Sequence, residues 1–124
     1  MAVYEKYDKN EDIQVGDLIS LMSPNNKAIR SVYKYWKHKN ILTIGVCSKI
    51  TGNEITIQDT GLIDVNVTGL VCIGDKLSIS NKAGKAKAIR YENMDEDIFN
   101  IRSIGKVVKL YNDYSKVQVL LDIE

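Results

Sequence analysis

A duplication constrains this chain of 124 residues more than any other feature. Two segments share one form: an apolar residue, a Gly-Asp pair, and a short run that ends in Ser. The segments that follow each of them also correspond, and the separations are 58, 60, 60 and 62 residues. The corresponding pairs are Val15–Ser20 with Ile73–Ser78, Ala28–Arg30 with Ala88–Arg90, Ile44–Val46 with Ile104–Val107, and Ile55–Ile57 with Val117–Val119. So small a drift in spacing predicts one β module of about sixty residues that occurs twice.

The pattern within each half is typical of short antiparallel strands, because apolar and polar residues alternate between turn residues. The expected strands are Leu18–Met22, Ala28–Tyr35, Ile41–Cys47, Glu54–Asp59, Leu62–Thr68, Lys76–Ser80, Ala86–Tyr91, Ile101–Leu110 and Lys116–Ile123. No stretch combines helical periodicity with helix caps. We therefore predict an all-β fold, a small β-barrel or sandwich of about ten short strands built from two sequence-related halves.

The expected domain organisation is an N-terminal arm, residues 1–12, followed by a single β domain, residues 13–124. The internal repeat would divide this domain into residues 13–68 and 69–124. The arm is polar, and Tyr4 and Tyr7 are its large apolar side chains. Such an arm is either frayed at the terminus or anchored on a neighbouring subunit by its two tyrosines.

Composition argues against several classes of function. The formal net charge is +1, which gives little of the phosphate neutralisation that a dedicated nucleic-acid binder needs. Neither a signal peptide nor an apolar run of about twenty residues is present, so we expect synthesis in the cytoplasm and no membrane association. Cys47 and Cys72 lie in apolar runs and are expected in the core. With His38 the single histidine, we expect no enzyme, no metal site and no cofactor.

One stretch interleaves cations with aromatic side chains, a combination that suits contact with a ligand. Its residues are Arg30, Tyr33, Lys34, Tyr35, Trp36, Lys37, His38 and Lys39. Three interpretations stay open: a strand end and hairpin loop in which Trp36 covers the end of a barrel, a surface for a protein partner, or a site for single-stranded nucleic acid.

The corresponding segment of the second half is acidic, and it contains Glu92, Asp95, Glu96 and Asp97. Lys34, Lys37 and Lys39 give the first segment the opposite charge. Loops of opposite charge on one subunit suit a head-to-tail contact between copies, and such a contact can close into a ring. The two segments therefore predict a homo-oligomer.

The order of these motifs resembles the capsid cement or head decoration proteins of tailed bacteriophages. It is also similar to the C-terminal chaperone modules of phage tail spikes and appendages, some of which cleave themselves from a parent chain. The motifs that carry the resemblance are Val15–Asp17, Ile44–Val46, Gly61–Gly69, Ile73–Leu77, Gly84–Ala86, Ile104–Val107 and Val117–Leu121. No residues match a self-cleavage site, so the resemblance carries over no catalytic residue, and the start at Met1 favours a stand-alone subunit.

The resemblance implies a non-enzymatic virion structural protein. Its most specific form is a capsid decoration protein, synthesised in the cytoplasm of a bacterial host, that binds the outer capsid surface as an oligomer. The partner would then be the major capsid protein or another virion protein. The alternatives are a tail, baseplate or fibre component, a carbohydrate- or nucleic-acid-binding β module that uses Trp36, and a self-processing protease.

Overall fold

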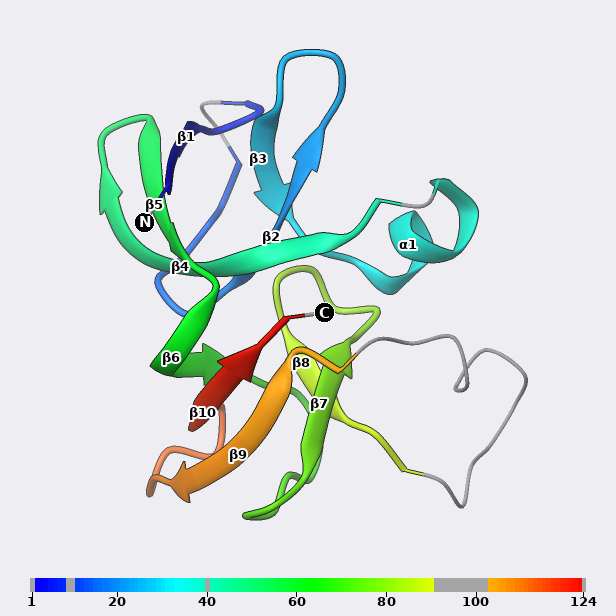
Figure 1. The fold of residues 1–124 in the computed structure, drawn as a ribbon, viewed down its shortest axis with the longest axis vertical. Helices are drawn as coiled ribbons and strands as arrows, with labels where there is room; N and C mark the ends of the chain where they lie inside the picture. Colours follow the sequence, from blue (N-terminus) through cyan, green and yellow to red (C-terminus); the bar gives the residue numbers. More distant parts are fainter. Residues whose placement is uncertain (1, 9–10, 40, 91–102, 124) are drawn as a thin grey trace.

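The computed structural model describes residues 2–8, 11–39, 41–90 and 103–123, and for residues 38 and 39 it describes the backbone alone. Two five-stranded antiparallel sheets pack in a sandwich-like arrangement, which confirms the all-β prediction, and they do not close into a barrel (Figure 1). The elements are β1 (Ala2–Glu5), β2 (Leu18–Met22), β3 (Lys27–Arg30), α1 (Tyr33–Lys39), β4 (Thr43–Thr51), β5 (Glu54–Gln58), β6 (Thr60–Asn66), β7 (Lys76–Ile79), β8 (Ala86–Ala88), β9 (Gly105–Leu110) and β10 (Lys116–Asp122).

The two sheets have the same topology. The strand order is β1-β5-β4-β2-β3 in one and β6-β10-β9-β7-β8 in the other, so each strand corresponds to the strand five places later. A single parallel bridge lies at the same place in both, Lys6 with Ala28 and Val67 with Ala86. We call β1–β5 the first module and β6–β10 the second module.

The first module begins earlier than the sequence predicts. Residues 1–12 were expected to form an arm, but Ala2–Glu5 are β1 and pair with β5 in antiparallel register. Tyr4 lies opposite Ile55 in this pairing, as Val65 of β6 lies opposite Val117 of β10. The modules therefore meet between β5 and β6, rather than at the predicted boundary between residues 68 and 69.

The repeated Gly-Asp pair forms the same turn in each module. Gly16 and Gly74 have φ angles of +94° and +91°, a backbone conformation that glycine adopts without a steric penalty. The carboxylates of Asp17 and Asp75 each accept a hydrogen bond from the backbone N–H three residues earlier, at 2.9 and 2.8 Å. This local hydrogen bond fixes the turn, which explains why both residues occur at both places.

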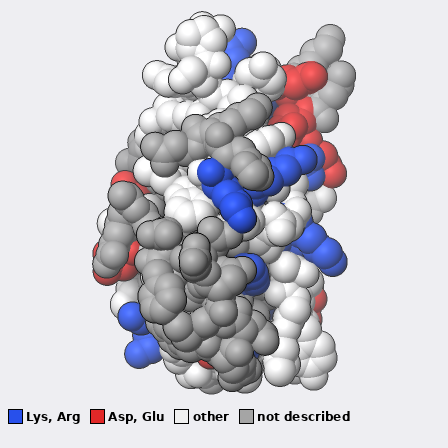
Figure 2. All heavy atoms as spheres, turned by 90° about the vertical axis from the view of Figure 1, so that its right-hand side faces the viewer, with Lys and Arg blue, Asp and Glu red and all other residues white. Residues whose placement is uncertain are grey.

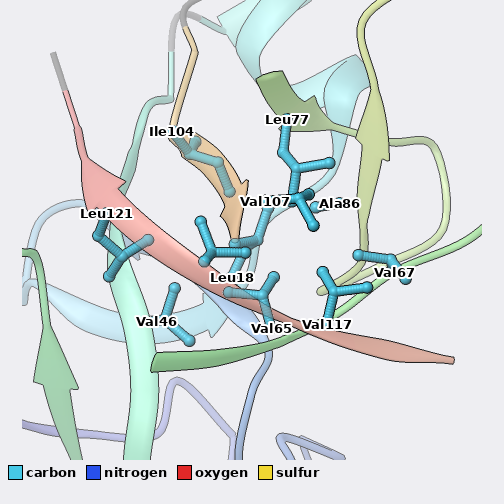
Figure 3. Close-up of a cluster of buried hydrophobic side chains, with 11 residues drawn as sticks. Leu18, Val46, Val65, Val67, Leu77, Ala86, Ile104, Val107, Val117 and Leu121 are labelled. Atoms are coloured by element: carbon cyan, nitrogen blue, oxygen red, sulfur yellow. The ribbon is translucent and has the colours of Figure 1, made fainter. Parts of the chain in front are cut away.

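Each module has its own cluster of buried apolar side chains. The first contains Ile13, Ile19, Ala28, Cys47, Ile55 and Ile57. The second contains Leu18, Val46, Val65, Val67, Leu77, Ala86, Ile104, Val107, Val117, Val119 and Leu121 (Figure 3).

Two members of the second cluster come from the first module. Leu18 and Val46 are fully buried, and they lie opposite each other on β2 and β4. Successive side chains of a strand point to opposite faces, so Ile19 and Cys47 face the first cluster while Leu18 and Val46 enter the second. The two modules thereby share one joint of buried side chains.

Backbone hydrogen bonds strengthen this joint. The Leu18 N–H donates to the carbonyl of Gly84 at 2.8 Å, and the Gly84 N–H donates to the carbonyl of Ser31 at 2.9 Å. The Asn66 N–H donates to the carbonyl of Gly16, also at 2.9 Å. These bonds join the Gly-Asp turn of the first module to β6 and to the β7–β8 hairpin of the second.

The expected strand Ala28–Tyr35 is wrong beyond Arg30, because Tyr33–Lys39 form the helix α1. Val32 is buried, and Tyr35 and Trp36 are half-buried. The spacing of these three residues is i, i+3, i+4, so one face of α1 packs against the fold. The alternation of a strand would instead place Tyr35 and Trp36 on opposite faces.

Candidate functional site

The aromatic residues of α1 form a compact cluster with lysines. The rings of Tyr33 and Trp36 lie with their centroids 5.6 Å apart and are tilted by 32°. The ammonium groups of Lys37 and Lys87 lie 5.9 and 5.5 Å from the centroid of the Tyr33 ring. Both distances fall within the range of cation–π attraction. Lys87 belongs to β8 of the second module, and the sequence pattern did not point to it.

The face that carries α1 shows Lys and Arg side chains gathered over its middle (Figure 2). Lys34 and Lys37 are exposed, whereas Tyr33, Tyr35 and Trp36 are half-buried. The ammonium group of Lys34 lies 5.6 Å from the centroid of the Tyr35 ring. The rings therefore hold the helix on the fold and also present part of their surface beside positive charge.

Several predicted contact residues lie elsewhere or outside the described residues. The Nε of Arg30 lies 2.8 Å from Oε1 of Glu11, and this hydrogen bond raises the pKa of Arg30. Tyr4 packs against the first cluster, and Tyr7 is exposed. The residues outside the described side chains are His38, Lys39, Glu92, Asp95, Glu96 and Asp97, so the head-to-tail hypothesis stays a prediction.

A second surface, which the sequence did not predict, lies at the turns of the second module that precede β7 and join β9 to β10. A groove of about 240 Å³ lies there. Leu70 and Tyr114 are 80% and 87% exposed on it, and the neighbouring Ile73 is 64% exposed. We call this surface the apolar groove, and its lining residues are Gly69, Leu70, Val71, Cys72, Leu110, Tyr111, Tyr114, Lys116 and Val117.

The first module provides an internal reference for this groove. Since Asp17 and Asp75 are equivalent, Leu70 corresponds to Asp12 and Cys72 to Gln14. A second pair of equivalent bonds fixes the residues that precede β5 and β10: the Lys6 N–H donates to the carbonyl of Asn53, and the Val67 N–H donates to the carbonyl of Ser115. Tyr114 corresponds to Gly52 and Lys116 to Glu54.

These counterparts in the first module, Asp12, Gln14, Gly52 and Glu54, are all exposed and lack large apolar side chains. The module therefore folds with a polar surface at this place, and its own packing does not require an apolar one. An exposed apolar patch beyond the needs of the fold marks a site of interaction.

Tyr111 forms a fixed wall of the groove. Its hydroxyl donates a hydrogen bond of 2.6 Å to Oδ1 of Asp64, and this bond raises the pKa of Tyr111 because the acceptor is a carboxylate. The ammonium group of Lys109 lies 5.4 Å from the centroid of the same ring. Lys116 is one of the lining residues, so a partner that combines a carboxylate with an apolar side chain would complement the groove.

The cysteines differ in their surroundings. Cys47 is buried as predicted, and burial raises the pKa of its thiol, but the prediction that Cys72 is a core residue is wrong because it is exposed in the groove. Among the residues that the structure describes, no three His, Cys, Asp or Glu side chains are placed to hold a metal ion. None of the described helices is long and apolar enough to span a membrane.

Comparison with known proteins gives no match to a family model, a curated protein or a solved structure. Function must therefore be inferred from the surfaces of the molecule itself. Those surfaces are the aromatic cluster of α1 and the apolar groove of the second module.

Proposed function

We propose that this chain is a structural subunit of a tailed-phage virion. Its most specific form is a capsid decoration protein that binds the outer capsid surface as an oligomer, without enzymatic activity. The apolar groove carries the proposal, because its two most exposed side chains, Leu70 and Tyr114, have an aspartate and a glycine as counterparts in the first module. The shared joint makes the two modules one preformed body, so attachment would lose little ordering entropy.

The groove suits a side chain of a partner as an anchor. Aromatic residues are enriched at the centre of protein interfaces, and Tyr111 and Tyr114 both line this groove. A groove of about 240 Å³ holds only a small apolar group, so one copy would bind weakly. An oligomer on a repeating capsid surface would gain affinity by avidity without new contacts.

The test is co-purification of the labelled chain with phage particles, followed by location with gold-labelled antibody. We expect many copies on the head. Replacing Leu70 and Tyr114 together by Ser should lower the copy number at least tenfold. Val15→Ser is the matched control, since Val15 is 55% exposed at the position of the first module that corresponds to Ile73. Particles without the chain, or full occupancy by the double variant, would overturn the proposal, and label on the tail would favour a tail, baseplate or fibre component.

The oligomeric state can be tested without particles by light scattering at about 50 and about 500 mM salt, because screening shortens the range of charge interactions. We expect an oligomer that persists at both concentrations. An oligomer of wild type that is lost at high salt would instead favour the oppositely charged segments. A monomer at both would refute preassembly.

A second candidate function is binding of carbohydrate or single-stranded nucleic acid by the cluster on α1. The observation that favours this function is the Tyr33 ring, which has two ammonium groups beside it and the tilted ring of Trp36 next to it. Titration of tryptophan fluorescence with an oligonucleotide and with a cell-wall glycan tests it, because Trp36 is the single tryptophan. A saturable change that Trp36→Phe removes would support it, and a flat titration with both probes would refute it.

A further inference from the structure

The two modules differ at one end of their buried clusters. In the second module this end contains Leu121, and Ile63 packs against it. Leu18 and Val46 of the first module belong to the same cluster, so side chains from outside the module take part in its packing (Figure 3).

The strand register identifies the matching positions in the first module. Ala2 lies opposite Ile57 as Ile63 lies opposite Val119, so Ala2 stands where the second module has isoleucine. Asp59 follows Gln58 at the end of β5, and the position that corresponds to it in β10 is Leu121. The first module thus has a small residue and a charged one in place of two large apolar residues.

A pocket of about 340 Å³ lies at this place, and we call it the end pocket. Its lining residues are Ala2, Tyr4, Ile44, Ile57 and Asp59. Within the described residues, the buried cluster of the first module contains side chains of the first module alone. The second cluster shows that a module of this fold can accept side chains from outside itself.

The lining of the end pocket selects for a particular chemistry. Ile44 and Ile57 give it aliphatic walls, and the half-buried ring of Tyr4 lies on the same lining. Asp59 is exposed, and within the described part of the chain its carboxylate has no ion pair or hydrogen bond. A carboxylate and an aromatic ring both attract a cation, and the aliphatic walls favour an alkyl stem.

We propose that the end pocket binds an alkylammonium group, with its stem against Ile44 and Ile57 and its ammonium group at Asp59. A lysine side chain of a partner and a free alkylamine have this same chemistry. The site is separate from the apolar groove, so the proposal does not depend on the function proposed above.

The test is titration of the full ¹⁵N-labelled chain with n-pentylammonium, followed by NMR. We expect saturable shifts of the amide signals of Tyr4, Ile44, Ile57 and Asp59, with a dissociation constant on the order of millimolar for so small a ligand. 1-Pentanol and pentanoate, which have the same stem, should bind at least tenfold more weakly. Equal binding of 1-pentanol, or shifts confined to other residues, would overturn the proposal.

A second probe, Nα-acetyl-lysine N-methylamide, distinguishes the two sources. If it shifts the same signals, a lysine side chain of a partner can enter the pocket. If n-pentylammonium alone binds, the site takes a free alkylamine. Either result supports the proposed chemistry, whereas absence of binding by both probes refutes it.

Variants separate the charge from the shape of the pocket. Asp59→Asn should weaken binding of n-pentylammonium at least fivefold, and Asp122→Asn, an exposed carboxylate on β10, should leave it unchanged. Ala2→Ile combined with Asp59→Leu copies the second module and should abolish binding. The spectrum of each variant reports whether it is folded, and unchanged affinity in folded Asp59→Asn would refute the role of the carboxylate.

Discussion

Leu18 is one of the two side chains of the first module that enter the second cluster. It is fully buried and belongs to the second cluster, although β2 lies in the first sheet. Replacing a buried leucine by alanine costs about 3–5 kcal/mol, because apolar burial is lost and a cavity is left. A domain of this size has a free energy of unfolding of about 5–15 kcal/mol, so we expect Leu18→Ala to stay folded with much reduced stability.

The magnitude can be measured by urea unfolding followed with circular dichroism. Ile19→Ala is the matched comparison, because Ile19 is the next residue, is also fully buried, and faces the first cluster. Methyl NMR then locates each effect. Leu18→Ala should shift the methyl signals of Val65 and Val107 in the second module, whereas Ile19→Ala should shift those of Ile55 in the first.

Two results would refute the proposed joint. One is a loss of less than about 1 kcal/mol for Leu18→Ala, which would mean that the site collapses without a cavity or is not buried. The other is a set of methyl shifts confined to the first cluster, which would mean that Leu18 does not reach the second module.

Three further predictions concern single residues. Gly84→Ala should destabilise the fold at least twice as much as Gly52→Ala in urea unfolding. Both glycines have positive φ, which costs other residues about 1–2 kcal/mol. A Cβ at Gly84 would also lie 2.7 Å from Cγ of Asp17, whereas nothing lies within 4 Å of a Cβ at Gly52. Burial raises the pKa of Asp17, so the folded state holds the carboxyl proton more tightly than the unfolded chain. Between the ordinary pKa near 3.8 and the raised pKa, the free energy of unfolding should therefore fall as pH rises. Subtracting the pH dependence of Asp17→Asn from that of wild type should show this fall. The ring signals of Tyr111 should titrate above the ordinary pKa of 10.0 in an NMR experiment, and Asp64→Asn should return the pKa toward that value; an unchanged pKa would contradict the role of the carboxylate.

The sequence could predict the duplicated β architecture because the Gly-Asp turn depends on local chemistry. Positive φ and a side-chain to backbone hydrogen bond need only neighbouring residues, and both copies kept them. The prediction was less accurate where residues of the two halves were matched by their identity and not by strand register. The Ala-Ile-Arg segments at Ala28 and Ala88 suggested a separation of 60, but strand pairing makes Ala86 the counterpart of Ala28, and both are fully buried.

Two elements were missed because tertiary contacts decide them. β1 has no strong alternation of its own, and it becomes a strand by pairing with β5. α1 has seven residues and no acidic residue in its first turn, so no cap signalled it. The spacing of Val32, Tyr35 and Trp36 was the available signal, and the Tyr33 N–H bonded to the carbonyl of Ser80 holds its start on the second module.

The candidate sites were harder to predict than the fold. The apolar groove and the end pocket are recognised only when each residue is compared with its counterpart in the other module, and that comparison needs the strand register. Leu70, for example, is one apolar residue among many in the sequence. Its significance comes from its 80% exposure and from the aspartate at the corresponding position of the first module.

The residues at the free ends of the molecule explain why the stacking of modules stops at two. Different surfaces of the two modules meet at the joint, and such a heterologous contact could in principle repeat without limit. The second module has Lys76 where the first has Leu18, so a third module stacked in the same way would bury an ammonium group in an apolar cluster. At the other end, the first module has Asn26 at the position that corresponds to Gly84. At the joint, the side chain of Asp17 fills the space that a Cβ on Gly84 would need. The Cβ of Asn26 would therefore clash with the corresponding aspartate of a preceding module. Both ends therefore oppose continuation, as terminal repeats do in repeat proteins. Any oligomer of this chain would therefore need a surface other than those that meet at the joint.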